Sequence, residues 1–140
     1  METRIKTQFG LVRYELSPKF SMQEGSFLGQ SIKEAFGYLN SSLSKLKKGE
    51  FDENLVNSLF NGSEEVLGIL GNLIEKFKNK ALICKRERAY SDSEGNADTS
   101  ILASVSEEGE IKIYDAFFNT REIKDNRAGV IIHEAATLQV

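Results

Sequence analysis

One histidine and the glutamate that follows it are the residues whose types and spacing best suit chemistry. His133 is the only histidine among 140 residues. It follows the apolar run Val130-Ile131-Ile132 and directly precedes Glu134. Zinc peptidases carry H-E-x-x-H on an apolar helix, because residues four apart share a face and two imidazoles can then bind one zinc ion. The glutamate reaches the metal-bound water as general base. Here Thr137 stands where the second histidine would be.

The residues before this helix add a second point of likeness. A predicted strand at 110–114 leads into the aromatic pair Phe117-Phe118, and the apolar helix with His133 and Glu134 follows. In that order, the chain from about residue 80 onward resembles the aspzincins, the deuterolysin and lysine-specific metallo-endopeptidase family of zinc peptidases. The helical part before it resembles the family only loosely.

The resemblance assigns roles to particular residues. It implies that His133 is the first zinc ligand and Glu134 the catalytic base. The second ligand falls on Thr137, and the family's third ligand is an aspartate after the motif helix, whereas the sequence ends at Val140. Two of the three protein ligands are thus missing, and one imidazole holds zinc too weakly to activate water. We therefore expect zinc as a cofactor of intact relatives and none bound by this chain.

The function expected on these grounds is a zinc metallo-endopeptidase-like domain, truncated or degenerate, that does not cleave peptides as given. The alternative is a non-catalytic protein-interaction or oligomerisation module. In that case, helices between Phe27 and Lys78 would offer a groove or a self-association surface, and the last helix would expose Ile131 and Leu138. Two plainer interpretations also stay open: a partly buried, hydrogen-bonded His133 and a solvent-facing Glu134.

Composition sets the class of protein and of partner. A length of 140 residues, with 40% hydrophobic and 28% charged residues, predicts one globular domain over 1–140. The formal net charge is −3 with both signs interspersed, so we expect a protein or peptide partner, or self-association, and not nucleic acid. No apolar stretch is long enough to span a membrane, and no signal peptide opens the chain, so the sequence predicts a cytoplasmic protein or one exported by a non-classical route.

Hydrophobic periodicity predicts the elements that must position the histidine and glutamate. Apolar residues recur at steps of three and four through three segments in the N-terminal half, which is typical of amphipathic helices. Alternation and turn residues predict strands and one hairpin in the C-terminal half. The sequence thus predicts an α+β fold with N-terminal helices, a small antiparallel sheet or hairpin, and a C-terminal helix carrying the partial motif. The predicted helices cover 27–47, 51–60, 63–78 and a last segment capped by Thr120; the predicted strands cover 9–14, 80–85, 101–105 and 110–114.

Two other candidates for chemistry give way to plainer interpretations. Cys84 lies in an apolar run, which favours a buried thiol, since a catalytic cysteine needs an activating histidine and His133 lies far along the chain. The polar segment 91–98 has the oxygen-rich composition of a calcium loop. Counting twelve positions from Asp92 reaches Ala103, where such a loop needs a glutamate, so the segment is predicted to be a hairpin loop.

Overall fold

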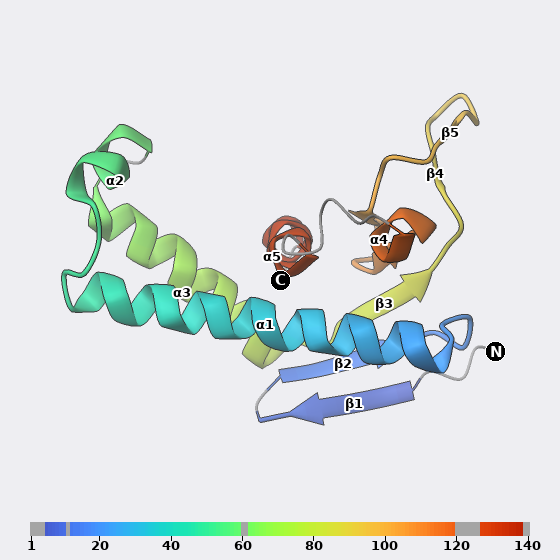
Figure 1. Ribbon diagram of the computed structural model, residues 1–140, viewed down its shortest axis with the longest axis horizontal. Coiled ribbons are helices and arrows are strands. Elements are labelled where there is room, and N and C mark those ends of the chain that lie inside the picture. The colour runs from blue at the N-terminus through green and yellow to red at the C-terminus, as the bar shows by residue number, and fades with distance from the viewer. Residues whose placement is uncertain (1–4, 11, 60–61, 120–126, 139–140) are drawn as a thin grey trace.

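A computed structural model describes residues 5–10, 12–59, 62–119 and 127–138 of the chain, and its fold is α+β as predicted (Figure 1). Five strands form the main sheet in the order β1-β2-β3-β7-β6, and a separate two-stranded ribbon joins β4 to β5. The strands are β1 (Ile5–Phe9), β2 (Val12–Leu16), β3 (Leu82–Arg86), β4 (Tyr90–Ser91), β5 (Ala97–Asp98), β6 (Ala103–Val105) and β7 (Ile111–Ile113).

The main sheet is mixed and not antiparallel throughout. The predicted hairpin is present, with β6 and β7 paired antiparallel. Strand β3, however, runs parallel to both of its neighbours, with Tyr14 opposite Leu82 and Cys84 opposite Ile111. The long helical segment between β2 and β3 allows the first pairing, and the segment 87–110 allows the second, because parallel neighbours need a crossover of a dozen or more residues.

The first strand prediction, 9–14, is wrong in its bounds. The chain turns back at Gly10, whose φ of 53° lies in the left-handed region, and β1 and β2 pair as a hairpin on either side of it. Strand β2 alternates in burial, with Val12, Tyr14 and Leu16 on the core side. That alternation identifies one face of the sheet as the face that meets the helices.

Helix α1 (Met22–Lys47) begins five residues before its predicted start. Ser21 and Glu24 form a capping box, in which each side chain accepts a hydrogen bond from the other residue's backbone amide. The predicted C-terminal end is confirmed, since Gly49 has a φ of 75° just beyond it. The predicted apolar stripe is also buried, notably at Leu28, Ile32, Ala35 and Leu39.

The next two helices depart from the prediction at their surfaces and caps. The apolar pattern of 51–60 predicts that Leu55 and Leu59 face inward. In α2 (Glu53–Leu59) their side chains are 56% and 67% exposed, so this prediction is wrong. Phe60 lies outside the described residues. The sequence predicts Ser63 as the N-cap of the next helix. In α3 (Ser63–Asn79) Gly62 is the N-cap, and Ser63 is already helical. Its last turns bury Leu73, Ile74 and Phe77 as predicted.

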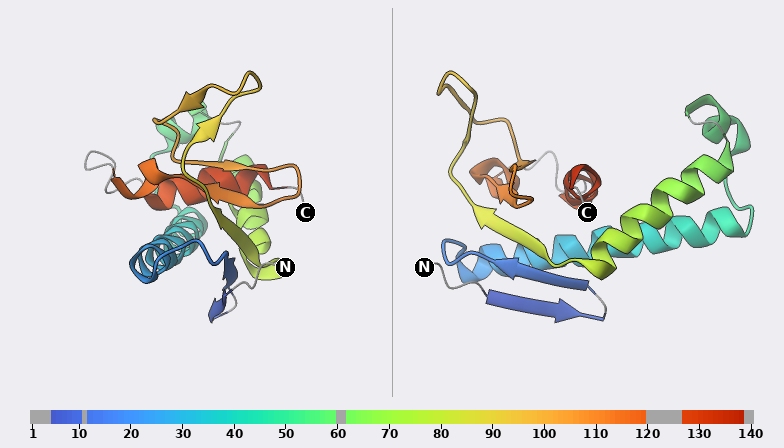
Figure 2. Two further views of the ribbon diagram at one scale, coloured as in Figure 1. Left: turned by 90° about the vertical axis from the view of Figure 1, so that its right-hand side faces the viewer. Right: turned by 180° about the vertical axis from the view of Figure 1, so that it is seen from behind.

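Helices α1, α3 and α5 (Arg127–Thr137) contact one another and share one hydrophobic core with the buried face of the sheet. The far half of α1, α2 and the start of α3 extend away from the sheet (Figures 1 and 2). Cys84 is 1% exposed in β3, which confirms the buried thiol, and burial raises its pKa to about 12. A thiol of that kind stays protonated and unreactive at neutral pH.

Candidate functional site

The histidine and glutamate lie on α5, beside one edge of the sheet. Strand β6 ends the strand order on that side, and α5 packs against it. The side chain of His133 is exposed, whereas Glu134, one residue later, is only 9% exposed. Glu134 therefore faces the protein, which rules out the interpretation of a solvent-facing glutamate.

Two open hollows meet at Glu134 and follow β6. The larger, about 680 Å³, is lined by Ala103–Gly109, Lys80, Glu134 and Thr137. The smaller, about 590 Å³, is lined by Ser100–Ala103 and, on the helix, by Gly129, Val130, His133 and Glu134. We call the two hollows together the β6–α5 groove. All three residues of the partial motif, His133, Glu134 and Thr137, line it.

The carboxyl group of Glu134 is held in a poorly solvated place. Desolvation by burial raises its pKa above the usual 4.5, and the neighbouring His133 charge opposes that rise in part. A carboxyl group of raised pKa in an open groove is a typical feature of sites that move protons. The same burial could not be read from the sequence, because it depends on how closely α5 packs against β6.

The side chains around Glu134 do not fit a zinc site by themselves. Thr137 stands four residues after His133, but its hydroxyl donates a hydrogen bond to the Glu134 carbonyl oxygen at 2.8 Å. Among residues 5–10, 12–59, 62–119 and 127–138, no three His, Cys, Asp or Glu side chains gather closely enough to hold a metal ion. We therefore assign no chemical step to a metal here.

Among the described strands, none pairs with the outer edge of β6. The Tyr114 amide donates to the Leu102 carbonyl at 3.0 Å, and the Ser106 amide donates to the Glu110 carbonyl at 2.9 Å. In an antiparallel ladder every second residue bonds to the same neighbour, so residues 102, 104 and 106 face β7. The amides and carbonyls of Ala103 and Val105 therefore point to the open edge.

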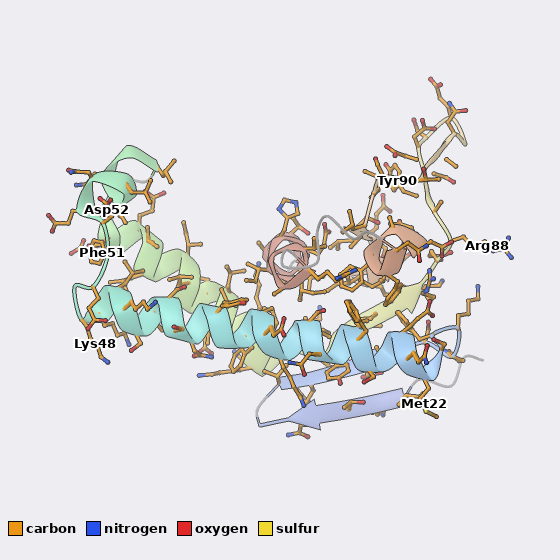
Figure 3. All side chains as sticks on the ribbon, in the orientation of Figure 1. Met22, Lys48, Phe51, Asp52, Arg88 and Tyr90 are labelled. Carbon is orange, nitrogen blue, oxygen red and sulfur yellow. The ribbon has the colours of Figure 1, made fainter. Side chains whose placement is uncertain are left out.

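The ribbon β4–β5 and β7 hold β6 in place. The segment 91–98 forms the predicted hairpin, in which the Asp92 carboxylate accepts hydrogen bonds from the Glu94 and Asn96 amides. Tyr90 lies at the base of this ribbon (Figure 3). Its ring meets that of Tyr114 edge to face. The Tyr114 hydroxyl in turn lies 2.6 Å from the Ser104 hydroxyl. These contacts keep β6 at a fixed place beside α5.

Two arginines that the sequence analysis did not single out hold the helices around the site. Arg127 is buried at the start of α5, donates from Nε to the Phe117 carbonyl at 2.7 Å and lies over the ring of Phe27. Arg86 is paired with Glu24 at 3.0 Å and with Asp115 at 2.7 Å. Both arginines contact residues far away in the sequence or on another element, so neither role could be inferred without the structure.

The aromatic pair lies in a helix and not at the end of a strand. Phe117 and Phe118 belong to the short helix α4 (Asp115–Asn119), which follows β7 directly. Phe117 is fully buried, and both rings meet Phe27 of α1 edge to face. The pair therefore anchors α4 against α1.

The expected exposure of the inner face of α5 is wrong. Ile131 is fully buried and Leu138 is 6% exposed, because α1 and α3 cover this face. The predicted cap at Thr120 lies outside the described residues, as do Glu122 and Ile123. None of the helices that the structure describes is long and apolar enough to cross a membrane.

No family model, curated protein or solved structure matches this chain. The resemblance to the aspzincins therefore stays a prediction from the residues quoted above. The function is therefore inferred from the geometry of the β6–α5 groove.

Proposed function

We propose that this chain is a zinc-metallopeptidase-like domain that takes up an extended peptide in the β6–α5 groove and, as given, does not hydrolyse it. The observation that carries the proposal is the position of Glu134. It is a nearly buried carboxyl group that lines the groove directly beside the open edge of a β-strand. The His-Glu order on α5 supports peptidase ancestry.

The open edge of β6 favours a peptide over a small molecule. Ala103 and Val105 are two residues apart, so their outward groups match the spacing of a strand that adds to the sheet. Main-chain pairing of this kind gives affinity for any extended backbone. The side chains of α5 would then face the added strand and select among peptides.

The residues present favour binding without hydrolysis. His133 is the one imidazole of the chain, and the Thr137 hydroxyl is already bonded to a backbone carbonyl. A neutral hydroxyl is a poor zinc ligand beside imidazole, thiolate or carboxylate. Zinc itself, where a peptidase of this type holds it, polarises the peptide carbonyl and lowers the pKa of the attacking water.

Zinc content and peptidase activity test the catalytic half of the proposal. Elemental analysis of the purified protein and of His133→Ala is expected to find far less than one zinc per chain in both. Casein digestion with added zinc is expected to match the buffer control. Zinc-dependent cleavage that disappears in Glu134→Gln would overturn this half, and the site would then be completed by residues outside the described ones.

Peptide selection tests the binding half. We would pan a phage-displayed library of random dodecapeptides against the protein and measure the enriched peptides by fluorescence anisotropy. Val105→Pro removes an amide that points to the open edge and leaves the ladder to β7 intact. The affinity for the peptide is expected to fall at least tenfold, because one hydrogen bond is lost and the proline ring obstructs the added strand. Val105→Thr keeps the amide and the branched shape and should bind like the wild type. Equal binding by Val105→Pro, with its circular dichroism unchanged, would refute edge pairing.

One observation favours the second candidate, an oligomerisation module. Leu55 and Leu59 of α2 and Ile69 of α3 are 56%, 67% and 42% exposed on the helical part that extends from the sheet. Sedimentation velocity over a wide concentration range would test it. A concentration-dependent dimer that Leu59→Glu abolishes would favour this candidate, and a monomer throughout would contradict it.

A further inference from the structure

The smaller hollow of the β6–α5 groove differs in character from the larger one. Its walls are apolar at Ile101 and Leu102 before β6 and at Val130 on α5, and the helix also contributes two titratable residues, His133 and Glu134. Its size, about 590 Å³ open to solvent, exceeds any single side chain. We call it the Gly129 hollow, after the glycine that lines it on the helix.

Gly129 lines the hollow without a side chain of its own. It lies exposed on α5, and a Cβ atom built on it would meet nothing within 4 Å. Glycine has a lower helix propensity than alanine, and no close contact within the described residues requires it here. Position 129 can therefore take a larger side chain, which would enter the hollow.

The pairing geometry of β6 directs side chains of an added strand toward this hollow. Residues directly opposite each other in neighbouring strands point to the same face of the sheet, and successive residues alternate. The Ala103 side chain faces α5, since it is buried in the shared core. Every second side chain of a strand paired with β6 therefore lies on the α5 side, whichever way that strand runs. The side chain of the added strand that lies opposite residue 101 would meet Ile101 and Val130, which line the same hollow.

We propose that the Gly129 hollow is a subsite for one bulky apolar side chain, such as leucine, isoleucine or phenylalanine, of an extended peptide bound along β6. The inference rests on the proposed peptide binding and adds to it the class of peptide selected. Burial of an apolar side chain against Ile101, Leu102 and Val130 removes apolar surface from water, which favours binding. A carboxylate there would lose water without a partner among these three residues, so acidic side chains are rejected.

The test uses two substitutions at one position. Gly129→Leu places a side chain in the hollow and leaves the edge of β6 untouched, while Gly129→Ala adds only a methyl group and serves as the control. Both replace glycine by a better helix former with open space around it, so neither is expected to lower stability. Thermal denaturation of both variants checks this point.

The probes are two fluorescein-labelled nonapeptides of alternating threonine and serine, one with leucine and one with aspartate at its centre. The wild type and Gly129→Ala are expected to bind the leucine peptide about tenfold more tightly, which one apolar side chain in a fitting pocket can supply. Gly129→Leu is expected to bind both peptides equally. Equal binding of the two peptides by the wild type, still abolished by Val105→Pro, would overturn the subsite and leave peptide pairing standing. Binding of neither peptide, or binding insensitive to Val105→Pro, would overturn both.

Discussion

Helix α1 lies so close to the sheet that one added methyl group should be measurable. At Gly29 an alanine Cβ would lie 2.4 Å from the Tyr14 hydroxyl oxygen and 3.3 Å from the ring carbon that bears it. Both residues are buried, and Tyr14 is only 6% exposed on β2. Because the first distance is far inside van der Waals contact, Gly29→Ala must push α1 away from the sheet or move the tyrosine.

The expected magnitude combines two opposing effects. Overpacking of a buried site costs about 1–3 kcal/mol, and the gain of an alanine over a glycine inside a helix is about 1 kcal/mol. Gly29→Ala should therefore lower the free energy of unfolding by up to about 2 kcal/mol. Gly37 lies in the same helix with nothing within 4 Å of its Cβ position, so Gly37→Ala should instead raise that free energy by up to about 1 kcal/mol.

Urea denaturation followed by circular dichroism at the helix band measures these differences. The double variant Tyr14→Phe/Gly29→Ala removes the oxygen at 2.4 Å and leaves the ring carbon at 3.3 Å, so it should recover part of the loss. A double-mutant cycle with Tyr14→Phe alone isolates that coupling from the tyrosine's own hydrogen bonding. If Gly29→Ala is as stable as Gly37→Ala, the inferred close approach of α1 to β2 is wrong.

Two further predictions concern charge. Arg86→Met should lower the free energy of unfolding near neutral pH by about 2 kcal/mol, since it removes the hydrogen-bonded pairs with Glu24 and Asp115. The Arg86 hydrogen bond lowers the pKa of Glu24 below 4.5, so this stability is present above pH 4.5 and is lost as the pH falls through the folded-state pKa. Urea titrations in acid should therefore bring the unfolding free energies of the two proteins closer together. An unchanged difference between them would contradict this. Glu134→Gln should stabilise the protein near neutral pH and have little effect below pH 4.5. Burial raises the folded-state pKa of Glu134, so the wild type loses stability as the pH rises through that pKa, and the glutamine variant does not. A lower urea midpoint for Glu134→Gln than for the wild type at neutral pH would refute this.

Much of the local structure could be predicted from the sequence. The apolar stripes of α1 and α3 repeat at the helical period, and the turn around Gly109 with its alternating flanks identifies the β6–β7 hairpin. The predicted end of α1 at Gly49 is also confirmed. These features depend on residues within a few positions of one another, so local spacing is enough to find them.

Predictions failed where distant residues decide the outcome. The inward position expected for Leu55 and Leu59 follows from the pattern within α2, but α2 lies on the part of the molecule that extends from the core. The exposure expected for Ile131 failed for the converse reason, because α1 and α3 cover the inner face of α5. A helical pattern shows which residues share a face and does not show whether another element covers it.

The candidate site divides in the same way. The sequence by itself determined that His133 and Glu134 are adjacent on an apolar helix and that Thr137 stands at the position of a second ligand. Only the tertiary structure decided that Glu134 is buried, that β6 ends the sheet beside it and that Ala103 and Val105 point to the open edge. The parallel pairing of β3 with β2 and β7 fixes this order of strands. Those pairings join segments far apart in the sequence, so their free energy comes from contacts across the whole fold, which local spacing does not encode.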